Sequence, residues 1–339
     1  MSAEELRGPP ARVDRWEAST GSPQHQVVEG SRVRWWPVLV VAPLLAVVVA
    51  AGPAPVRVTE AAPAVLDARS TGVPLDVNPS VERWMEAFQT TRRAEFEHLL
   101  LRREIYAPMI REKLRARGMP EELVYIPMIE SGLSPFAVSR VSAVGLWQFM
   151  GPTAQQYGLR VDPWVDERRD PIAATDAALE YLAWLHHRFG DSWTLAAAAY
   201  NAGPGRVERV LNRHAEGWLG DEELFWEIRE HLPRETREYV PKMIAVTRLA
   251  NMADDLGFDG SSVEAYRYDN VFVPGGTSLS TIARELDVEL EALEVLNPHL
   301  LRGVTPPDEI FPLRVPVGES ASVVDGLSGR SMIRLADDD

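Results

Sequence analysis

The 339-residue chain contains no cysteine. It therefore has no disulfide framework, no cysteine-based zinc site, no thiol nucleophile and no acylated cysteine that could anchor it to a lipid. The formal net charge is −15, and no basic stripe is present to contact phosphates, so nucleic acid is not expected as a partner. His186 and His187 point in different directions on a helix, with no third ligand spaced to join them. Neither a metal nor any other cofactor is expected.

One long uncharged run lies near the N-terminus. Residues 35–52 read WWPVLVVAPLLAVVVAAG, which as a helix would span about 27 Å of a bilayer core of ~30 Å. Arg32 and Arg34 precede it, which predicts a single-pass signal anchor in the cytoplasmic (inner) membrane, with residues 1–34 inside the cell. A cleaved signal peptide is the alternative, since small residues follow the run. Both interpretations place the rest of the chain in the periplasm or cell envelope.

Composition divides the chain further. Residues 1–34 are polar and of mixed charge, which predicts a disordered tail, and residues 53–77 are rich in Pro and Ala, as in a tether. Residues 78–257 show helical periodicity with short breaks and no strand-like alternation, so an all-α domain is expected. Within it, the pattern predicts one helix over about 92–101 and a separate one that contains residues 105–114 and stops at Gly118. Residues 318–339 are expected to be a disordered tail.

The most informative segment is Ile129-Glu130-Ser131-Gly132. Leu123, Ile126 and Glu130 share one helical face, so the carboxyl is expected to lie against an apolar wall. Desolvation penalises the charged form of such a group, which then keeps its proton near neutral pH, as a general acid must. A capping or salt-bridged glutamate would be the simpler interpretation of this residue alone.

Two further blocks favour the catalytic interpretation. Residues 145–149 read GLWQF and residues 199–203 read AYNAG. The first offers a small residue for close backbone approach, an aromatic ring and an amide, and the second places a phenol and an amide at a helix end. Amides, hydroxyls and aromatic faces around one protonated carboxyl are a chemistry suited to carbohydrate. Core packing is the simpler interpretation of Trp147 or Tyr200 taken singly.

In this order, the blocks resemble the catalytic domain of the lytic transglycosylases, of the membrane-bound murein transglycosylase D type. The resemblance covers residues 78–257 and includes Ser139, the segment 162–170 and Glu235-Thr236-Arg237 leading to Tyr239. It implies a lysozyme-like helical fold and non-hydrolytic cleavage of the MurNAc-β-1,4-GlcNAc bond of peptidoglycan glycan strands, leaving 1,6-anhydroMurNAc ends, with Glu130 as single acid and base. The residues that it implies in substrate binding are Ser131, Ser139, Gly145, Gln148, Phe149, Tyr200, Asn201, Glu235 and Tyr239.

Two alternatives stay open from the sequence. A second catalytic carboxylate, recruited from Asp162, Asp166, Glu167, Asp170 or Glu180, would make the protein a goose-type lysozyme that uses water. Clustering of these acids with Arg168 and Arg169 favours a solvated or salt-bridged loop instead. The other alternative is a non-catalytic protein that only binds peptidoglycan. Protein partners are not predicted.

Residues 268–317 form a second predicted unit. A short strand at Val271–Val273, helices around residues 279–286 and 290–296, and an alternating strand at residues 311–315 give a βααβ order. This order resembles the LysM peptidoglycan-binding module. The usual Gly-Asp-Thr-Leu appears here as Gly276-Thr277-Ser278-Leu279, without the Asp, so binding of glycan by this unit is left open against a purely packing role.

Overall fold

The computed structural model describes residues 72–258 and 263–327. The predicted tail 1–34, the predicted anchor 35–52 and nearly all of the predicted tether lie outside the described residues. Inside those two ranges, the structure has no helix that combines the length and the apolar character needed to cross a bilayer.

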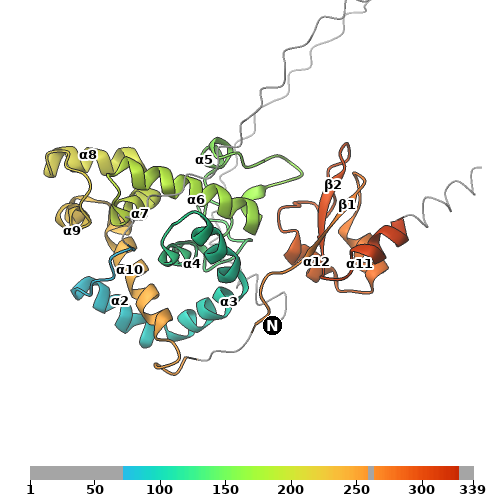
Figure 1. Ribbon diagram of the computed structural model, residues 1–339, viewed down its shortest axis with the longest axis horizontal. Coiled ribbons are helices and arrows are strands. Elements are labelled where there is room, and N and C mark those ends of the chain that lie inside the picture. The colour runs from blue at the N-terminus through green and yellow to red at the C-terminus, as the bar shows by residue number, and fades with distance from the viewer. Residues whose placement is uncertain (1–71, 259–262, 328–339) are drawn as a thin grey trace, which may run out of the picture. The chain divides into compact units, whose positions relative to one another are not determined.

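The first part of the described chain is helical (Figure 1). Its elements are α2 (Pro79–Gln89), α3 (Arg93–Ala116), η1 (Glu121–Val124), α4 (Tyr125–Ser131), α5 (Gly151–Gln156), η2 (Glu167–Arg169), α6 (Pro171–Arg188), α7 (Trp193–Ala202), α8 (Pro204–His214), α9 (Leu224–Ile228), η3 (Arg229–His231) and α10 (Arg234–Asn251).

Local chemistry sets several of these boundaries. Asn78 begins α2, where its side-chain oxygen accepts hydrogen bonds from the backbone N–H groups of Ser80 and Val81 at 2.9 and 3.2 Å. Asp170 begins α6 in the same way, through the N–H groups of Ile172 and Ala173. Each side chain satisfies donors that a helix start leaves free.

The two helices predicted at about 92–101 and 105–114 are one continuous helix, α3, so that part of the prediction is wrong. The polar residues between them do not form a loop. Arg103 in this stretch donates to the carbonyl of Ala250, at the end of α10, at 2.9 Å. Tertiary contacts of this kind override a local break in the apolar pattern. Pro108 lies inside the helix without ending it.

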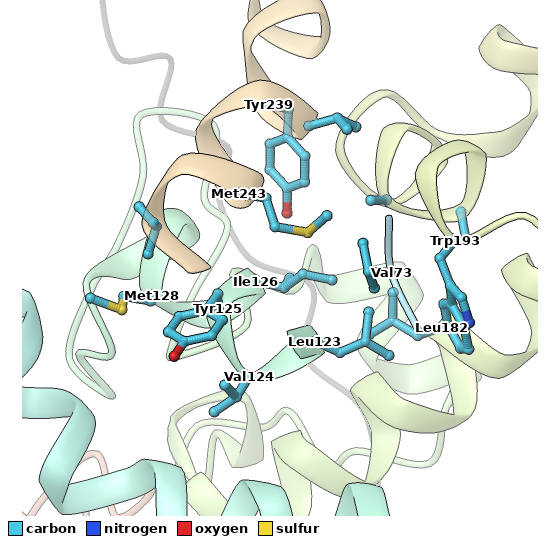
Figure 2. Packing of buried hydrophobic residues seen from close by; sticks show 14 of the residues in the cluster. Val73, Leu123, Val124, Tyr125, Ile126, Met128, Leu182, Trp193, Tyr239 and Met243 are labelled. Carbon is cyan, nitrogen blue, oxygen red and sulfur yellow. The ribbon is translucent and has the colours of Figure 1, made fainter. Parts of the chain in front are cut away.

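Helix α4 lies in the middle of the helical region, with α2, α3, α6, α7 and α10 around it (Figure 1). Residues 123–128, at the end of η1 and the start of α4, are apolar and buried. Figure 2 shows Tyr239 and Met243 projecting from α10 towards this buried segment. A helix that is apolar on every side is stable only at the centre of a domain.

The second part of the described chain has the predicted βααβ order: β1 (Asp269–Val273), α11 (Leu279–Leu286), α12 (Leu290–Leu296) and β2 (Phe311–Val315). The two strands pair antiparallel, with Val271 opposite Leu313. Residues 320–327 are also helical, and Val323 is fully buried in the core of this unit. The unit therefore extends beyond residue 317, where the sequence placed its end, because Val323 supplies an apolar side chain to the same core.

Candidate active site

Glu130 lies in the last turn of α4. Pro127 falls in the first turn of this short helix, where a missing N–H costs no hydrogen bond, so the helix begins late instead of kinking. Gly132 adopts the left-handed conformation and ends the helix. Glu130 is thus fixed at a helix terminus, with its carboxyl directed towards α10.

The Glu130 carboxyl is a desolvated acid. Its pKa is raised to about 7; burial is the largest cause, and the nearby charge of Glu235 acts in the same direction. A hydrogen bond donated by the Tyr239 hydroxyl to Glu130 Oε1 at 2.7 Å and the positive charge of Lys242 act in the opposite direction. The carboxyl therefore keeps its proton to much higher pH than an exposed glutamate does, which suits a group that acts as an acid and then as a base near neutral pH.

Lys242 is a site residue that the sequence analysis missed. It lies on α10 one turn after Tyr239, and its ammonium donates to the carbonyl of Ile129, next to Glu130, at 3.4 Å. The ammonium also lies 5.6 Å from the ring centroid of Trp84. Burial lowers its pKa, and Arg92 adds to that effect, while Glu95 and Glu130 oppose it. The sequence did hold a signal for Lys242, because it lies three residues after Tyr239 and residues at that spacing share one face of a helix.

Gly145 allows the GLWQF block (residues 145–149) to lie directly against the backbone of Arg168. Its φ is +83°, and a Cβ placed on it would lie 1.7 Å from the carbonyl oxygen of Arg168. Only glycine fits there. The loop is joined to α4 by Ser131, whose hydroxyl donates to the carbonyl of Leu146 at 2.7 Å. Ser131 thus braces the loop against the helix that carries Glu130.

Ser139 and Gln148 are also held by the backbone of this loop. The Ser139 hydroxyl oxygen accepts from the N–H groups of Val141 and Ala143 at 3.3 and 2.9 Å. The Gln148 amide donates to the carbonyl of Gly145 at 2.9 Å. Their orientation is fixed before any ligand arrives. Phe149 and Trp147, in contrast, are buried, and Trp147 Nε1 donates to Thr175 Oγ1 at 2.9 Å.

The AYN block meets the same loop from α7. The Tyr200 hydroxyl donates to the carbonyl of Trp147 at 2.8 Å, which brings the two blocks together. Asn201 accepts from the Thr236 hydroxyl at 2.8 Å and donates to Glu235 at 3.4 Å. Helices α7 and α10 therefore hold this amide between them. Of the sequence-predicted residues, Tyr200, Glu235 and Tyr239 lie near Glu130. Ser139 bonds only within its own loop, and several of the others serve as internal braces.

Three of the five carboxylates that could have formed a second catalytic group are engaged in ion pairs elsewhere. Asp162 pairs with Arg160, and Asp166 pairs with Arg168 at 2.8 Å. Asp170 caps α6 and pairs with Arg314 at 2.7 Å, where the guanidinium and His299 help to lower the pKa of the carboxyl against its burial. This agrees with the expected salt-bridged loop. The acid whose charge reaches Glu130 is Glu235.

No group of three or more potential metal ligands occurs within residues 72–258 and 263–327. The two adjacent histidines that were predicted not to bind metal lie in different surroundings. His186 is buried and stacks on Trp193 with the ring centroids 3.8 Å apart, whereas His187 is exposed.

Comparison with known proteins decides the family. Residues 108–218 match the transglycosylase SLT domain, and residues 267–329 match the LysM-like domain of lytic transglycosylase MltD. This chain contains an SLT domain. It carries Glu130, the GLWQF block and the AYN block within the matched residues, whereas Tyr239, Glu235 and Lys242 come from α10 beyond them. The predicted mainly α, lysozyme-like domain with a small βααβ domain after it is confirmed.

Two named proteins are similar in sequence to this chain in and around the SLT domain. The chain is 41% identical over 199 residues to membrane-bound lytic murein transglycosylase D of Escherichia coli K12, covering 58% of this chain and 43% of that protein. It is 30% identical over 128 residues to membrane-bound lytic murein transglycosylase C of Histophilus somni, covering 34% of this chain and 35% of that one. The chain thus spans less than half the length of these relatives.

A solved structure shows a partial likeness. The 70 kDa soluble lytic transglycosylase of Escherichia coli matches with 25% identity and a TM-score of 0.38, over 48% of this chain and 27% of that one.

Proposed function

We propose that this chain is a peptidoglycan lytic transglycosylase that cleaves the MurNAc-β-1,4-GlcNAc bond without water, in the remodelling of the cell wall. The observation that carries the proposal is the Glu130 carboxyl, with a pKa raised to about 7 and a 2.7 Å hydrogen bond from Tyr239. The SLT domain and the name of the relative in Escherichia coli support the substrate.

One carboxyl performs both proton transfers in this reaction. Protonated Glu130 gives its proton to the glycosidic oxygen as the bond from C1 to that oxygen breaks, and the N-acetyl group of the muramic acid stabilises C1. Ionised Glu130 then takes the proton of the C6 hydroxyl while O6 bonds to C1. The 1,6-anhydro ring forms, Glu130 regains its proton, and no water is consumed. The hydrogen bond from Tyr239 favours the ionised intermediate state of Glu130.

Binding of the muramoyl ring is assigned to four polar groups of the loop at residues 139–148 and of α7. Ser139, Gln148, Tyr200 and Asn201 are held in fixed orientations by bonds to the backbone or to α10. Fixed polar groups of this kind orient a substrate at little entropic cost. Ser131 and Gly145 shape the same loop, and Phe149 packs beneath it.

The test compares the full chain with a Glu130→Gln variant on purified peptidoglycan, with products read by mass spectrometry. Products lighter by one water than hydrolytic fragments, absent with the variant, are expected. Fragments with ordinary reducing ends would instead indicate a lysozyme, and no release with retained binding would indicate a binding protein.

The LysM-like domain is proposed to bind glycan as well. A pocket of about 510 Å³ is lined mainly by its residues around 278–280 and 297–304, with Phe136 and Arg169 completing it. Leu301 lines this pocket and is 43% exposed. In the Glu130→Gln background, Leu301→Asp should reduce sedimentation of the chain with insoluble peptidoglycan. Unchanged sedimentation would leave the domain a packing role.

The location proposed is the cell envelope, with residues 35–52 as a single-pass anchor in the inner membrane. The length and apolar character of that run and the membrane-bound relatives support it. Extraction of the full chain from membranes by detergent but not by high salt would agree with the anchor. Release by salt would contradict it.

A further inference from the structure

A row of aromatic rings continues outward from the candidate active site. The ring centroid of Tyr200 lies 5.4 Å from that of Tyr181, which in turn lies 5.0 Å from Tyr157 and 6.1 Å from Trp184. Tyr181 and Trp184 are three residues apart on α6 and so share one face, while Tyr157 ends α5. Three helices therefore contribute to one aromatic surface.

The row begins near Glu130 and leads to solvent. Tyr200 donates to the carbonyl of Trp147, in the loop that Ser131 joins to the helix carrying Glu130, and the charge of Glu130 helps to raise the Tyr200 pKa. Tyr157 and Tyr181 are half-buried, and Trp184 is 42% exposed. The row thus passes from the catalytic centre to the protein surface.

Core packing does not account for the outer part of this row. The buried face of α6 is made by Leu179, Leu182 and Leu185, and Trp184 lies off that face. Arg188 stands 5.0 Å from the Trp184 ring centroid and pairs with Glu208 at 2.6 Å, yet the ring stays exposed. A large indole exposed beside an active site is more informative than a scattered apolar residue.

The chemistry of the row suits sugar rings. Aromatic side chains offer flat apolar faces, and tyrosine adds a hydroxyl at the edge. Pyranose rings present apolar C–H faces flanked by hydroxyls, so both kinds of contact are available at each step.

We propose that Tyr157, Tyr181 and Trp184 form a glycan subsite that continues from Tyr200 and binds the neighbouring sugars of the strand being cleaved. The inference rests on the proposed function, because the occupant is a further part of the same substrate. Continuity with Tyr200 selects this occupant over an unrelated partner. The subsite favours long strands, since a short fragment that fills the catalytic centre does not reach Trp184.

The test is the kinetics of Trp184→Ala in the full chain on long glycan strands and on a purified tetrasaccharide. Trp218→Ala is the matched control, because Trp218 is 69% exposed and outside the row. On long strands, Trp184→Ala should raise KM about fivefold to tenfold with little change in kcat. On the tetrasaccharide it should behave as the unaltered chain, and Trp184→Phe should restore most of the affinity for long strands.

The outcomes separate the two proposals. Equal KM values for Trp184→Ala and Trp218→Ala on long strands would overturn the subsite, and so would an equal loss on both substrate lengths. If the unaltered chain released no anhydro products, the proposed function would fail first. Thermal denaturation of each variant shows whether a loss of activity comes from unfolding. If Trp184→Ala is unfolded, the affinity of Trp184→Phe for long strands decides whether the subsite exists.

Discussion

The Tyr239 hydroxyl donates a 2.7 Å hydrogen bond to Glu130 Oε1, joining residues that are 109 positions apart in the sequence. This bond favours the ionised carboxylate and opposes the desolvation that raises its pKa. The two residues belong to α10 and α4, so the chemistry of the acid depends on how these helices pack. The same contact gives the proposed catalytic group a measurable signature.

Tyr239→Phe should shift the alkaline limb of the pH–rate profile to higher pH. Without the hydroxyl, the Glu130 pKa rises further and the protonated form persists to higher pH. The carboxylate needed for the second proton transfer is then less stable, so kcat should fall about tenfold or more, as for loss of a hydrogen bond to a charged group. Steady-state rates between about pH 5 and about pH 9 measure both effects. A limb that moved to lower pH would contradict this role.

Lys242→Met should also move the alkaline limb upward, because the ammonium lowers the Glu130 pKa. Glu235 and Tyr239 remain beside the carboxyl, and Arg92 and Glu95 remain beside the substituted position. Lys242→Arg keeps the charge and should leave the limb close to its original position. The comparison of the two pH profiles separates charge from packing. Identical profiles for Met and Arg would exclude an electrostatic role.

Glu235→Gln tests whether a second carboxylate takes part. Glu235 raises the Glu130 pKa, so its neutralisation should move the alkaline limb to lower pH, opposite to Lys242→Met. The anhydro product should persist, as shown by mass spectrometry. If anhydro product and rate were both lost while the variant stayed folded, Glu235 would be a catalytic group.

The stability of the chain relative to Glu130→Gln should fall as pH rises. The folded pKa of about 7 lies above the ordinary value of 4.5, so the folded state holds the proton more tightly than the unfolded state. The stabilisation that comes from the raised Glu130 pKa is fully present below the pKa of the unfolded state. It is lost as the pH rises through the pKa of the folded state. The difference between the two free energies of unfolding should change by about 2–3 kcal/mol from about pH 5 to about pH 8. Urea denaturation at both pH values measures it, and a constant difference would contradict the raised pKa.

Gly145→Ala should destabilise the fold by about 3 kcal/mol or more, since its Cβ would meet the Arg168 carbonyl oxygen at 1.7 Å. Gly158→Ala is the matched control: its φ is +79°, close to that of Gly145, but nothing lies within 4 Å of the added atom. The control should cost only about 1 kcal/mol of backbone strain. Equal losses in urea denaturation would show that strain, not contact, decides at residue 145.

Local features of the site and fold could be predicted where short-range chemistry decides. Asn78 caps α2 through N–H groups two and three residues away. The alternating residues 311–315 form β2, as predicted. Each effect acts within one turn or one strand, so the sequence contains all the information needed. The single helix α3 was missed because its continuity depends on Arg103 reaching the distant carbonyl of Ala250.

The sequence by itself singled out Glu130 as the candidate acid and determined the two companion blocks and the succession of a helical and a βααβ domain, because residue type and spacing carry these properties. Only the tertiary structure decided what surrounds the acid. Lys242 beside Glu130 and the outward row from Tyr200 to Trp184 join separate helices. The pKa of a carboxyl and the path of a substrate depend on distances in space, and these are fixed by packing between elements remote in the chain.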